Sequence, residues 1–408
     1  MAKLPSNLKV ALVHDYLNDF GGAERVLRVL ADMFPNAPIY TAFRRPDSSA
    51  AQAFSDRQII EWRHAWLIRH KNLHSPFRFL IPWIWESFDF SDYDLVISSA
   101  SGYVTKGLII STNTKHLCYC HTPPRFLYGY PTARSWQKYA PVRWYGDYLI
   151  KRLRPYDYWA AQRPDYFIAN SKEVQHRITK FYRRDSTVIY PPIDVADLRK
   201  NAQATSSSQN AERSEQYPAP IESSKSETNS DRIPDQVLDD DISEPYYLIV
   251  ARLVGTKGLE LALQAQQKLG FNLHIVGEAV GREWQNQTSG GGVTWLGRVS
   301  DTELAHQYAH AIAFLALAEN EDFGMTLVEA QSLGTPVIAH NSGGYKETVI
   351  PDKTGILFND YSVTGLTAAI SDFTTKKFNP ATIRKNADRF SRAQFESQLT
   401  DFISTHIK

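Results

Sequence analysis

The sequence has very little cysteine, which excludes several kinds of protein. Among its 408 residues only Cys118 and Cys120 are cysteines, so neither a disulfide framework nor a zinc cage built on cysteine can form. Their C-x-C spacing in an apolar run would point both side chains to one face of a strand. We therefore expect two reduced, structural thiols in a cytoplasmic protein.

Segments that would cross or enter a membrane are also missing. No run approaches the roughly 18 apolar residues of a transmembrane helix, and the first ten residues, MAKLPSNLKV, lack the apolar core of a secretory signal. The fingerprint G-x-G-x-x-G is absent after the strand-like segments 9–15 and 246–253. A nicotinamide- or flavin-dependent dehydrogenase is therefore a weak hypothesis.

What the sequence does contain is a repeated alternation of short apolar runs and helical patterns. These runs are apolar on consecutive residues, which is typical of parallel strands buried on both faces. They lie at 9–15, 93–100, 115–122, 165–171, 186–192, 246–253, 272–277, 293–297, 311–318 and 335–340. Two such series predict an α/β protein with two Rossmann-like domains that face each other across a cleft, where ligands bind.

Between the two series the composition changes. Residues 201–244 carry ten acidic against three basic side chains and almost no large apolar ones, so they cannot bury enough surface to offset the entropy cost of ordering. We predict a disordered acidic, serine-rich insertion there, which serves as a passive spacer or, alternatively, as a regulatory or partner-binding tail. The expected domains are 1–195 and 245–375, with C-terminal helices at 376–408 that pack back on the first domain.

Two loops contain groups suited to a diphosphate. Gly21 and Gly22 open a helix after the first strand, so their backbone could approach a phosphate, although a tight turn explains the pair equally well. Arg252 ends a strand, and Lys257 follows at the start of the next helix. Two cations on one loop would neutralise a departing diphosphate, whereas a single surface cation is usually only solvated.

A histidine follows another strand end. In the segment CYCHTPPRF, His121 comes directly after an apolar run and before two prolines that stiffen the loop. A lone histidine is more often structural than functional, but the carboxyl end of a strand is where ligands bind in such sheets. His121 is therefore a candidate site residue.

The stretch ENEDFGMTLVEAQ places two carboxylates on either side of a predicted helix start. Glu321 lies in the loop, and Glu329 lies about one turn into the helix. Free N–H groups around Gly324, Met325 and Thr326 would face a ligand. Helix capping explains one carboxylate. A nucleotide sugar, with a diol at each end and a diphosphate between them, explains both.

These segments resemble a known family. E-D-F-G-M-T-L-V-E is similar to the E-x(7)-E signature of the family-4 retaining glycosyltransferases, which have the GT-B fold. GGAERV, NSKEV, YPPID, A-R-L-x-x-x-K-G, GRVSDTEL and GTPVIAHNSGGYKETV match the family in the same order. The combination of HDYL…GGAE with CHTPPR looks most like bacterial mannosyltransferases of O-antigen and exopolysaccharide assembly, which use GDP-mannose.

The resemblance implies catalytic roles for four residues. Arg252 and Lys257 would neutralise the diphosphate as the nucleotide departs. Glu321 would bind hydroxyls of the transferred sugar, and His121 would contact that sugar near the reacting carbon. The first domain would bind the acceptor, and the second would bind the donor.

The resemblance also implies a set of donor-binding residues. They are Gly21, Gly22, Arg298, Val299, Phe323, Gly324, Met325, Thr326, Leu327 and Glu329. Gly22 would approach the diphosphate through its backbone, and the amides of 323–327 would bind sugar and phosphate. Glu329 would hold the ribose hydroxyls, and Arg298 with Val299 would frame the base.

The chemistry implied by the family is transfer with retention of configuration and without an essential metal or cofactor. The DDD at 239–241 lies in the predicted insertion, and no other D-x-D occupies a suitable loop. We expect a front-face substitution in which the departing phosphate oxygen takes the acceptor's proton. The alternatives are a family-4 enzyme that uses a UDP-hexose or UDP-N-acetylhexosamine, and an inactive scaffold that only binds nucleotide sugars.

The first domain is unusually aromatic and basic in two segments. Seven of nine tryptophans lie between Trp62 and Trp159, and residues 125–163 hold eight Lys or Arg against two acids. This pattern suits an anionic membrane surface, although aromatic packing or nucleic-acid stacking could also produce it; no nucleic-acid motif accompanies it. We expect attachment to the inner face of the cell membrane and a glycan or lipid-linked glycan acceptor, with Arg125 as a candidate contact.

Overall fold

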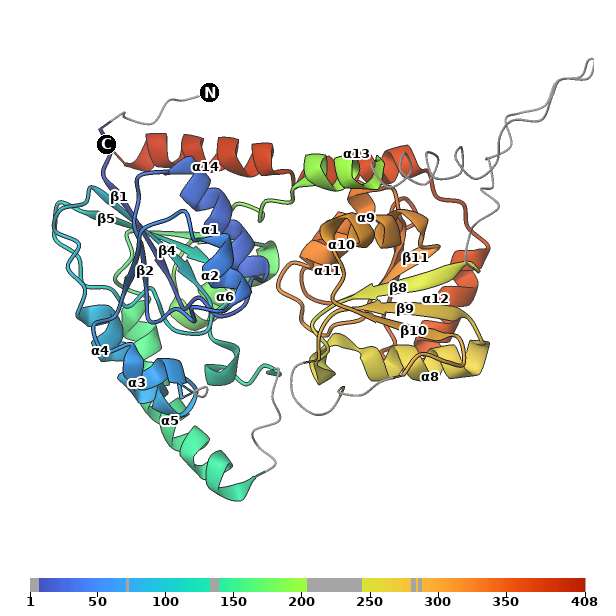
Figure 1. Ribbon diagram of the computed structural model, residues 1–408, viewed down its shortest axis with the longest axis horizontal. Coiled ribbons are helices and arrows are strands. Elements are labelled where there is room, and N and C mark those ends of the chain that lie inside the picture. The colour runs from blue at the N-terminus through green and yellow to red at the C-terminus, as the bar shows by residue number, and fades with distance from the viewer. Residues whose placement is uncertain are drawn as a thin grey trace, which may run out of the picture.

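The computed structural model describes residues 7–70, 73–132, 139–203, 244–279, 284 and 288–407. Two α/β domains stand side by side and are joined along one edge by the last two helices (Figure 1). The predicted insertion at 201–244 falls almost wholly outside the described residues. The two parallel-sheet domains expected from the sequence are confirmed.

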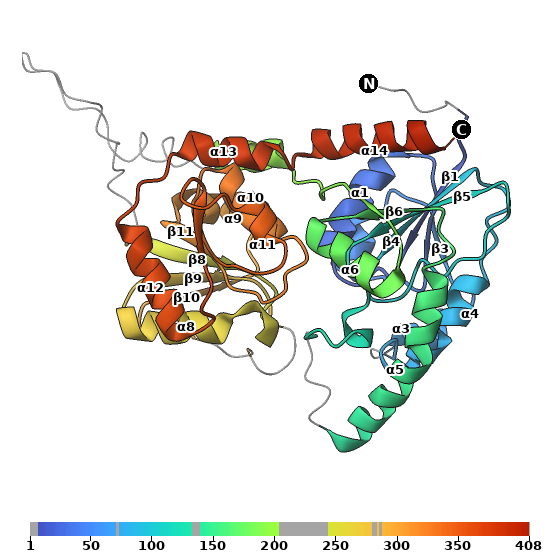
Figure 2. The ribbon, with the colours of Figure 1, turned by 180° about the vertical axis from the view of Figure 1, so that it is seen from behind.

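The N-terminal domain is built on a seven-stranded parallel sheet in the order β3-β2-β1-β4-β5-β6-β7. Its strands are β1 (Val10–His14), β2 (Ile39–Thr41), β3 (Ile59–Glu61), β4 (Leu95–Ala100), β5 (Lys115–Cys120), β6 (Tyr166–Ala169) and β7 (Thr187–Val188). The segment VALVH is buried along all of β1 because helices cover both faces of the sheet. Figure 2 shows this arrangement from behind.

The helices of this domain return the chain between parallel strands. They are α1 (Gly22–Met33), α2 (Ser49–Ala53), α3 (Trp66–Arg69), α4 (Ile81–Glu86), α5 (Ala140–Ala160) and α6 (Lys172–Tyr182). The start of α6 is capped by Ser171, whose hydroxyl accepts a hydrogen bond from the Val174 amide. This start lies at the carboxyl end of β6, and so it faces the cleft.

The C-terminal domain has a six-stranded parallel sheet in the order β10-β9-β8-β11-β12-β13. The strands are β8 (Tyr246–Val250), β9 (Asn272–Val276), β10 (Val293–Gly297), β11 (Ala313–Ala316), β12 (Val337–His340) and β13 (Gly355–Phe358). The helices are α8 (Leu259–Leu269), α9 (Asp301–His310), α10 (Met325–Ser332), α11 (Tyr345–Thr348), α12 (Val363–Thr374) and α13 (Pro380–Asp388). Because both sheets are parallel, the carboxyl ends of the strands lie along one edge of each sheet.

The last two helices pack on different domains. Helix α13 packs on α10 of the C-terminal domain. The final helix α14 (Arg392–His406) lies on the N-terminal domain instead, where Phe395, Leu399 and Ile403 join the core formed by β1 and α1. The chain therefore ends on the domain in which it began.

Three strands were not predicted from the sequence. Strands β2 and β3 have three residues each, and β13 has four. Both thiols of β5, Cys118 and Cys120, are free and belong to one buried cluster, which fits the structural role expected. Among the described helices, none is long and apolar enough to cross a membrane.

Candidate active site

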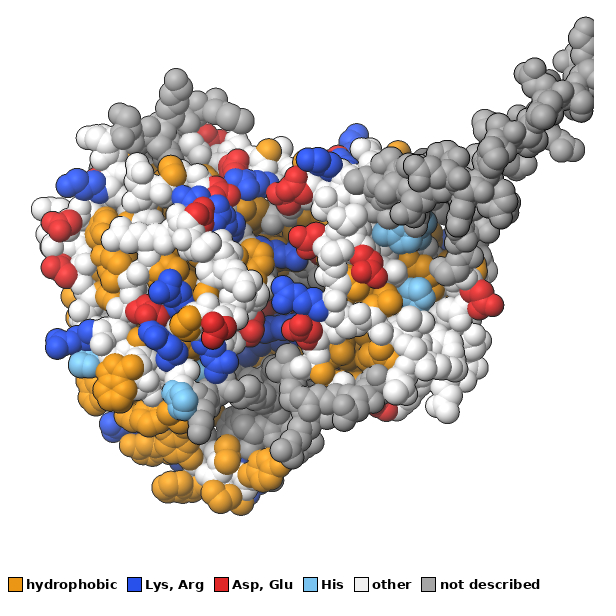
Figure 3. Space-filling view, viewed as in Figure 1, with side chains coloured by type: hydrophobic (Ala, Val, Ile, Leu, Met, Phe, Trp, Pro, Cys, Tyr) orange, Lys and Arg blue, Asp and Glu red, His pale blue; other side chains and the backbone are white. Residues whose placement is uncertain are grey.

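A cleft of about 2710 Å³ separates the two domains where both sets of strands end. The predicted site residues that line it are Gly21, Gly22, His121, Arg125, Arg252, Lys257, Arg298, Val299, Glu321, Phe323, Gly324, Met325, Thr326 and Glu329. Leu327 is fully buried and its side chain is not part of the lining. Figure 3 shows Lys, Arg, Asp and Glu side chains gathered along the boundary between the domains.

Glu321 and Lys257 form an ion pair on the side of the cleft that the C-terminal domain forms. Their Oε2 and Nζ atoms are 2.7 Å apart. Burial alone would raise the pKa of the Glu321 carboxyl, but the charges of Lys257, Arg125 and Arg252 hold that pKa below its usual value. The carboxylate is therefore ionised near neutral pH and can accept hydrogen bonds from sugar hydroxyls.

The start of α10 is shaped by a glycine in the left-handed conformation. Gly324 has φ +93°, and a Cβ placed on it would lie 2.6 Å from the Tyr345 ring, so no other residue fits without strain. Gly324 has no side chain to cap α10, which leaves the amides of the first turn facing the cleft. Across the cleft, a Cβ on Gly22 would lie 3.0 Å from Met325 Sδ.

The second carboxylate of the stretch, Glu329, is already paired. It is 2% exposed, and its Oε2 accepts a 2.8 Å hydrogen bond from the Tyr308 hydroxyl. Its Oε1 is bound by the guanidinium of Arg25, which comes from α1 of the opposite domain. A ligand diol that binds Glu329 at both oxygens would have to displace Arg25.

His121 lies at the end of a chain of polar side chains in the N-terminal domain. Its Nε2 is 2.8 Å from Ser99 Oγ, and Ser99 Oγ is 3.0 Å from His14 Nδ1. His14 Nε2 in turn lies 3.3 Å from the Glu24 carboxylate. Burial lowers the pKa of His121 to about 3, so the imidazole is neutral near pH 7 and carries no charge to a substrate.

Glu24 is held in place by hydrogen bonds at the start of α1. Its Oε2 accepts a 2.9 Å bond from the Gly21 amide, as a first-turn acid does in a capping box. Burial would raise the pKa of Glu24, but the bonds from His14 and Gly21 lower it. Glu24 therefore both caps the helix and orients His14.

The remaining predicted donor residues lie at exposed positions of the cleft. Arg252 follows β8 and is exposed, as is Arg298 after β10, while Val299 is half-buried. Within the described residues no group of three or more metal-ligating side chains is present. The wall of the cleft formed by the C-terminal domain thus holds two exposed arginines, the Lys257–Glu321 ion pair and the amides at the start of α10.

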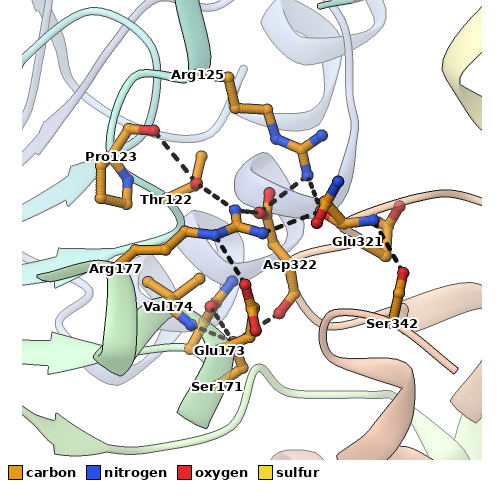
Figure 4. A network of polar contacts seen from close by, with 12 residues as sticks. Thr122, Pro123, Arg125, Ser171, Glu173, Val174, Arg177, Glu321, Asp322 and Ser342 are labelled. Carbon is orange, nitrogen blue, oxygen red and sulfur yellow. Dashed lines mark hydrogen bonds and ion pairs between the residues drawn. The ribbon is translucent and has the colours of Figure 1, made fainter. Parts of the chain in front are cut away.

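Arg125, predicted as an acceptor contact, points at the loop of the C-terminal domain that carries Glu321. Its Nη2 donates to the Asn320 carbonyl at 2.8 Å and lies 2.9 Å from Asp322 Oδ1. Figure 4 shows Arg125 and Arg177 converging on Asp322. Both arginines therefore contact the residues next to Glu321.

Several residues of the site were missed from the sequence. Arg25, Arg177, Asp322 and Tyr308 gain their roles from partners in another element, and two of the pairs join residues 304 and 145 positions apart. Asp322 sits inside the quoted stretch but had no partner in sequence to give it a role. Arg25 lies within the GGAERV segment, three residues after Gly22, and this position was its only signal in the sequence.

Comparisons with known proteins match both halves of the chain. Residues 20–197 match the family model described as Glycosyltransferase Family 4. Residues 234–390 match the model described as Glycosyl transferases group 1. Together the matches cover most of the chain, one in each domain.

Curated relatives match a limited part of the chain. A glycogen synthase of Thermodesulfovibrio yellowstonii is 29% identical over 175 residues, which is 40% of this chain and 33% of that protein. The sulfoquinovosyl transferase SQD2 of Arabidopsis thaliana is 28% identical over 156 residues, covering 36% and 31% respectively. The chain thus spans about a third of the length of these relatives.

The fold extends over the whole chain. The crystal structure of Anabaena Alr3699/HepE in complex with UDP superimposes with a TM-score of 0.64 and 17% identity, covering 98% of this chain and 100% of that one. At that identity the likeness establishes the architecture alone: two facing Rossmann-like domains with a cleft between them.

Proposed function

We propose that this chain, which carries the two domains of a GT-B glycosyltransferase, transfers a hexose from a nucleotide sugar to a glycan acceptor with retention of configuration. The observation that carries the proposal is the Lys257–Glu321 pair at 2.7 Å, set beside the uncapped start of α10. An ionised carboxylate for sugar hydroxyls and amides for phosphate then lie in one wall of the cleft.

The proposed reaction is a front-face substitution. The bond between the sugar's anomeric carbon and the diphosphate oxygen breaks, and the acceptor oxygen bonds to that carbon on the same face. The acceptor's proton passes to the departing phosphate oxygen. Lys257 and Arg252 offset the charge that develops on the diphosphate, and the neutral imidazole of His121 can share a hydrogen bond with the sugar.

The proposed donor is GDP-mannose. The support is the resemblance of HDYL…GGAE and CHTPPR to bacterial mannosyltransferases. A UDP-hexose is the second candidate, because the related Anabaena structure contains UDP. No metal or cofactor is required by the proposed mechanism.

The test is nucleotide diphosphate release from a panel of GDP- and UDP-sugars. Glu321→Ala should reduce turnover by about 10²–10³-fold, as removal of a preorganised transition-state contact does. The matched control is Glu303→Ala, since Glu303 is an exposed acid on α9. If no donor is bound or turned over, the proposed function is wrong. If only UDP-sugars react, the mannose assignment fails and the transferase assignment survives.

We also propose that the acceptor is presented at an anionic membrane surface. Trp66, Trp83, Trp144 and Trp159 are 67%, 64%, 74% and 66% exposed. They lie on α3, α4 and α5, which meet at one end of the N-terminal domain, where Figure 3 shows hydrophobic side chains gathered. Exposed basic residues such as Arg152 of α5 accompany them. The acceptor that we propose is a lipid-linked glycan on the inner face of the cell membrane.

Vesicle sedimentation tests this placement. The protein should sediment with vesicles containing anionic phosphatidylglycerol and not with neutral phosphatidylcholine vesicles. A Trp83→Ser/Trp144→Ser variant should lose most of that binding, because exposed tryptophans anchor at the interface. Its turnover of a water-soluble acceptor should stay unchanged. Equal binding of both proteins would contradict the proposal.

A further inference from the structure

Asp322, the residue after Glu321, is bound by two arginines of the opposite domain. Both Arg125 and Arg177 bind the Asp322 carboxylate, Arg125 through Nη2 at 2.9 Å and Arg177 through Nη1. Arg177 Nη2 also donates to the Asn320 carbonyl at 3.1 Å. The residues before and after Glu321 are therefore both held by side chains of the N-terminal domain, and Figure 4 shows the contacts to Asp322.

Arg177 is buried and its guanidinium is directed by its own domain. It is 1% exposed, and its Nε donates to Glu173 one turn earlier on α6 at 3.2 Å. Its Nη1 donates to Thr122 Oγ1 at 3.1 Å, and Thr122 follows His121 directly. One side chain thus links the loop that carries His121 to the loop that carries Glu321.

A second contact joins the same helix to the same loop. The Ser171 hydroxyl, which caps α6, donates to the Asp322 carbonyl at 2.6 Å. The first two amides of α6, those of Lys172 and Glu173, donate to the Glu347 carboxylate at 2.8 and 3.0 Å. Glu347 belongs to α11, so two neighbouring segments of the donor domain rest on the start of α6.

From within its own domain the main chain of Glu321 is also fixed. Its carbonyl accepts a 2.8 Å hydrogen bond from the Gly344 amide. A Cβ on Gly343, where φ is +56°, would lie 2.2 Å from that carbonyl oxygen. The loop therefore cannot shift toward Gly343, and the contacts from α6 restrain it from the other side.

We propose that Arg177 is a positioning residue, which holds the Glu321 loop opposite His121 by bridging the two domains. This inference rests on the proposed function, because it assigns Arg177 to the placement of a donor-binding carboxylate. A guanidinium suits this role because Nη1 reaches Thr122 and Asp322 while Nη2 reaches the Asn320 carbonyl. An ammonium has a single nitrogen and would keep only part of these contacts.

The test compares Arg177→Met, Arg177→Lys and Asp322→Asn with the wild type. Arg177→Met should lower kcat about 10²-fold, the loss expected from a small misplacement of a reacting group, while the donor KM changes little. Arg177→Lys should recover part of the loss. Asp352→Asn is the control, because Asp352 pairs with Lys376 on the surface of the donor domain alone.

A second measurement does not depend on catalysis. Small-angle scattering of unliganded Arg177→Met should show a larger radius of gyration than the wild type, because a bridge between domains is lost. If Arg177→Met does not fold, Asp322→Asn supplies both measurements, since Asp322 is partly exposed. Unchanged kcat and unchanged scattering in a folded variant would overturn the inference.

The two proposals fail in different ways. A wild-type protein that neither binds nor turns over any nucleotide sugar would refute the proposed function, and the scattering comparison would still decide whether Arg177 bridges the domains. An active wild type, with a strong effect of Glu321→Ala and none of Arg177→Met, would refute the positioning role only.

Discussion

Single residues in this cleft are constrained chiefly by the burial of charge. Glu329 is the clearest case, because it is 2% exposed and depends on two partners from different elements. An ionised carboxylate without partners is costly to bury. Its ion pair with Arg25 therefore stabilises the arrangement of the two domains as well as the carboxylate itself.

Replacing Arg25 should reveal this dependence. Arg25→Met should lower the free energy of unfolding by about 1–3 kcal/mol, because Glu329 would keep only its bond from Tyr308. In an Arg25→Met/Glu329→Gln double variant the two losses should not add, since the buried charge is gone. Urea denaturation of the four proteins measures this cycle, and strictly additive losses would contradict the pairing.

Two buried histidines should make the protein sensitive to acid. Burial lowers the pKa of both His116 and His121 to about 3 from 6.5. Below pH 6.5 these histidines take up protons in the unfolded chain but stay neutral in the native one. The free energy of unfolding therefore falls as the pH drops from 6.5 toward 3. At pH 5 each histidine costs about 2 kcal/mol.

His121→Gln should remove its share of this pH dependence. The difference in unfolding free energy between pH 7 and pH 5 should shrink by about 2 kcal/mol relative to the wild type. Denaturant unfolding at the two pH values is the measurement. A variant whose stability falls with acid as steeply as that of the wild type would show that His121 titrates normally in the native state.

At the scale of elements, the start of α10 depends on a glycine at one position. Gly324 combines φ +93° with an approach that leaves no room for a Cβ beside Tyr345. Gly270, which follows α8, has φ +73° but nothing within 4 Å of a built Cβ. Comparing substitutions at the two glycines therefore separates the cost of the left-handed backbone conformation from the cost of a clash with a neighbouring side chain.

Gly324→Ala should cost more stability than Gly270→Ala. The left-handed conformation alone costs an alanine about 1–2 kcal/mol, which is the whole effect expected at position 270. At position 324 the contact with Tyr345 adds to it, and displaced α10 amides should also weaken nucleotide binding. Thermal unfolding and nucleotide titration of both variants check this, and equal losses at the two positions would contradict it.

At the scale of the whole molecule, the last helix ties the chain's end to its beginning. Leu399 of α14 is 1% exposed within the core that also contains Leu12 and Leu30 of the N-terminal domain. The chain thus crosses from the second domain back to the first, as Figure 1 shows. Loss of that packing should affect the first domain and leave the second intact.

Leu399→Ala should lower the stability of the N-terminal domain by about 2–5 kcal/mol through the cavity it creates. The exposed neighbour Gln394→Ala serves as control, with a change within about 0.5 kcal/mol. Urea denaturation measures the loss of stability, and native-state amide hydrogen exchange shows in which domain it occurs. An effect confined to the C-terminal domain would contradict the packing described.

Ten of the thirteen strands in the described residues, the two domains and the residues at the strand ends could be predicted from sequence pattern. Apolar runs such as VALVH specify buried parallel strands, and parallel strands bring their carboxyl ends to one edge. That is why His121, Lys257 and Glu321 could be placed around one cleft in advance. These features depend on local pattern, which a sequence displays directly.

The tertiary structure alone decided which groups pair across the cleft. Arg25 with Glu329 and Arg177 with Asp322 join residues 304 and 145 positions apart, from different domains. Nothing local distinguishes these arginines from solvated ones, because an ion pair is defined by the distance between its partners. Their roles depend on how the second domain docks on the first, which side-chain packing over both domains determines.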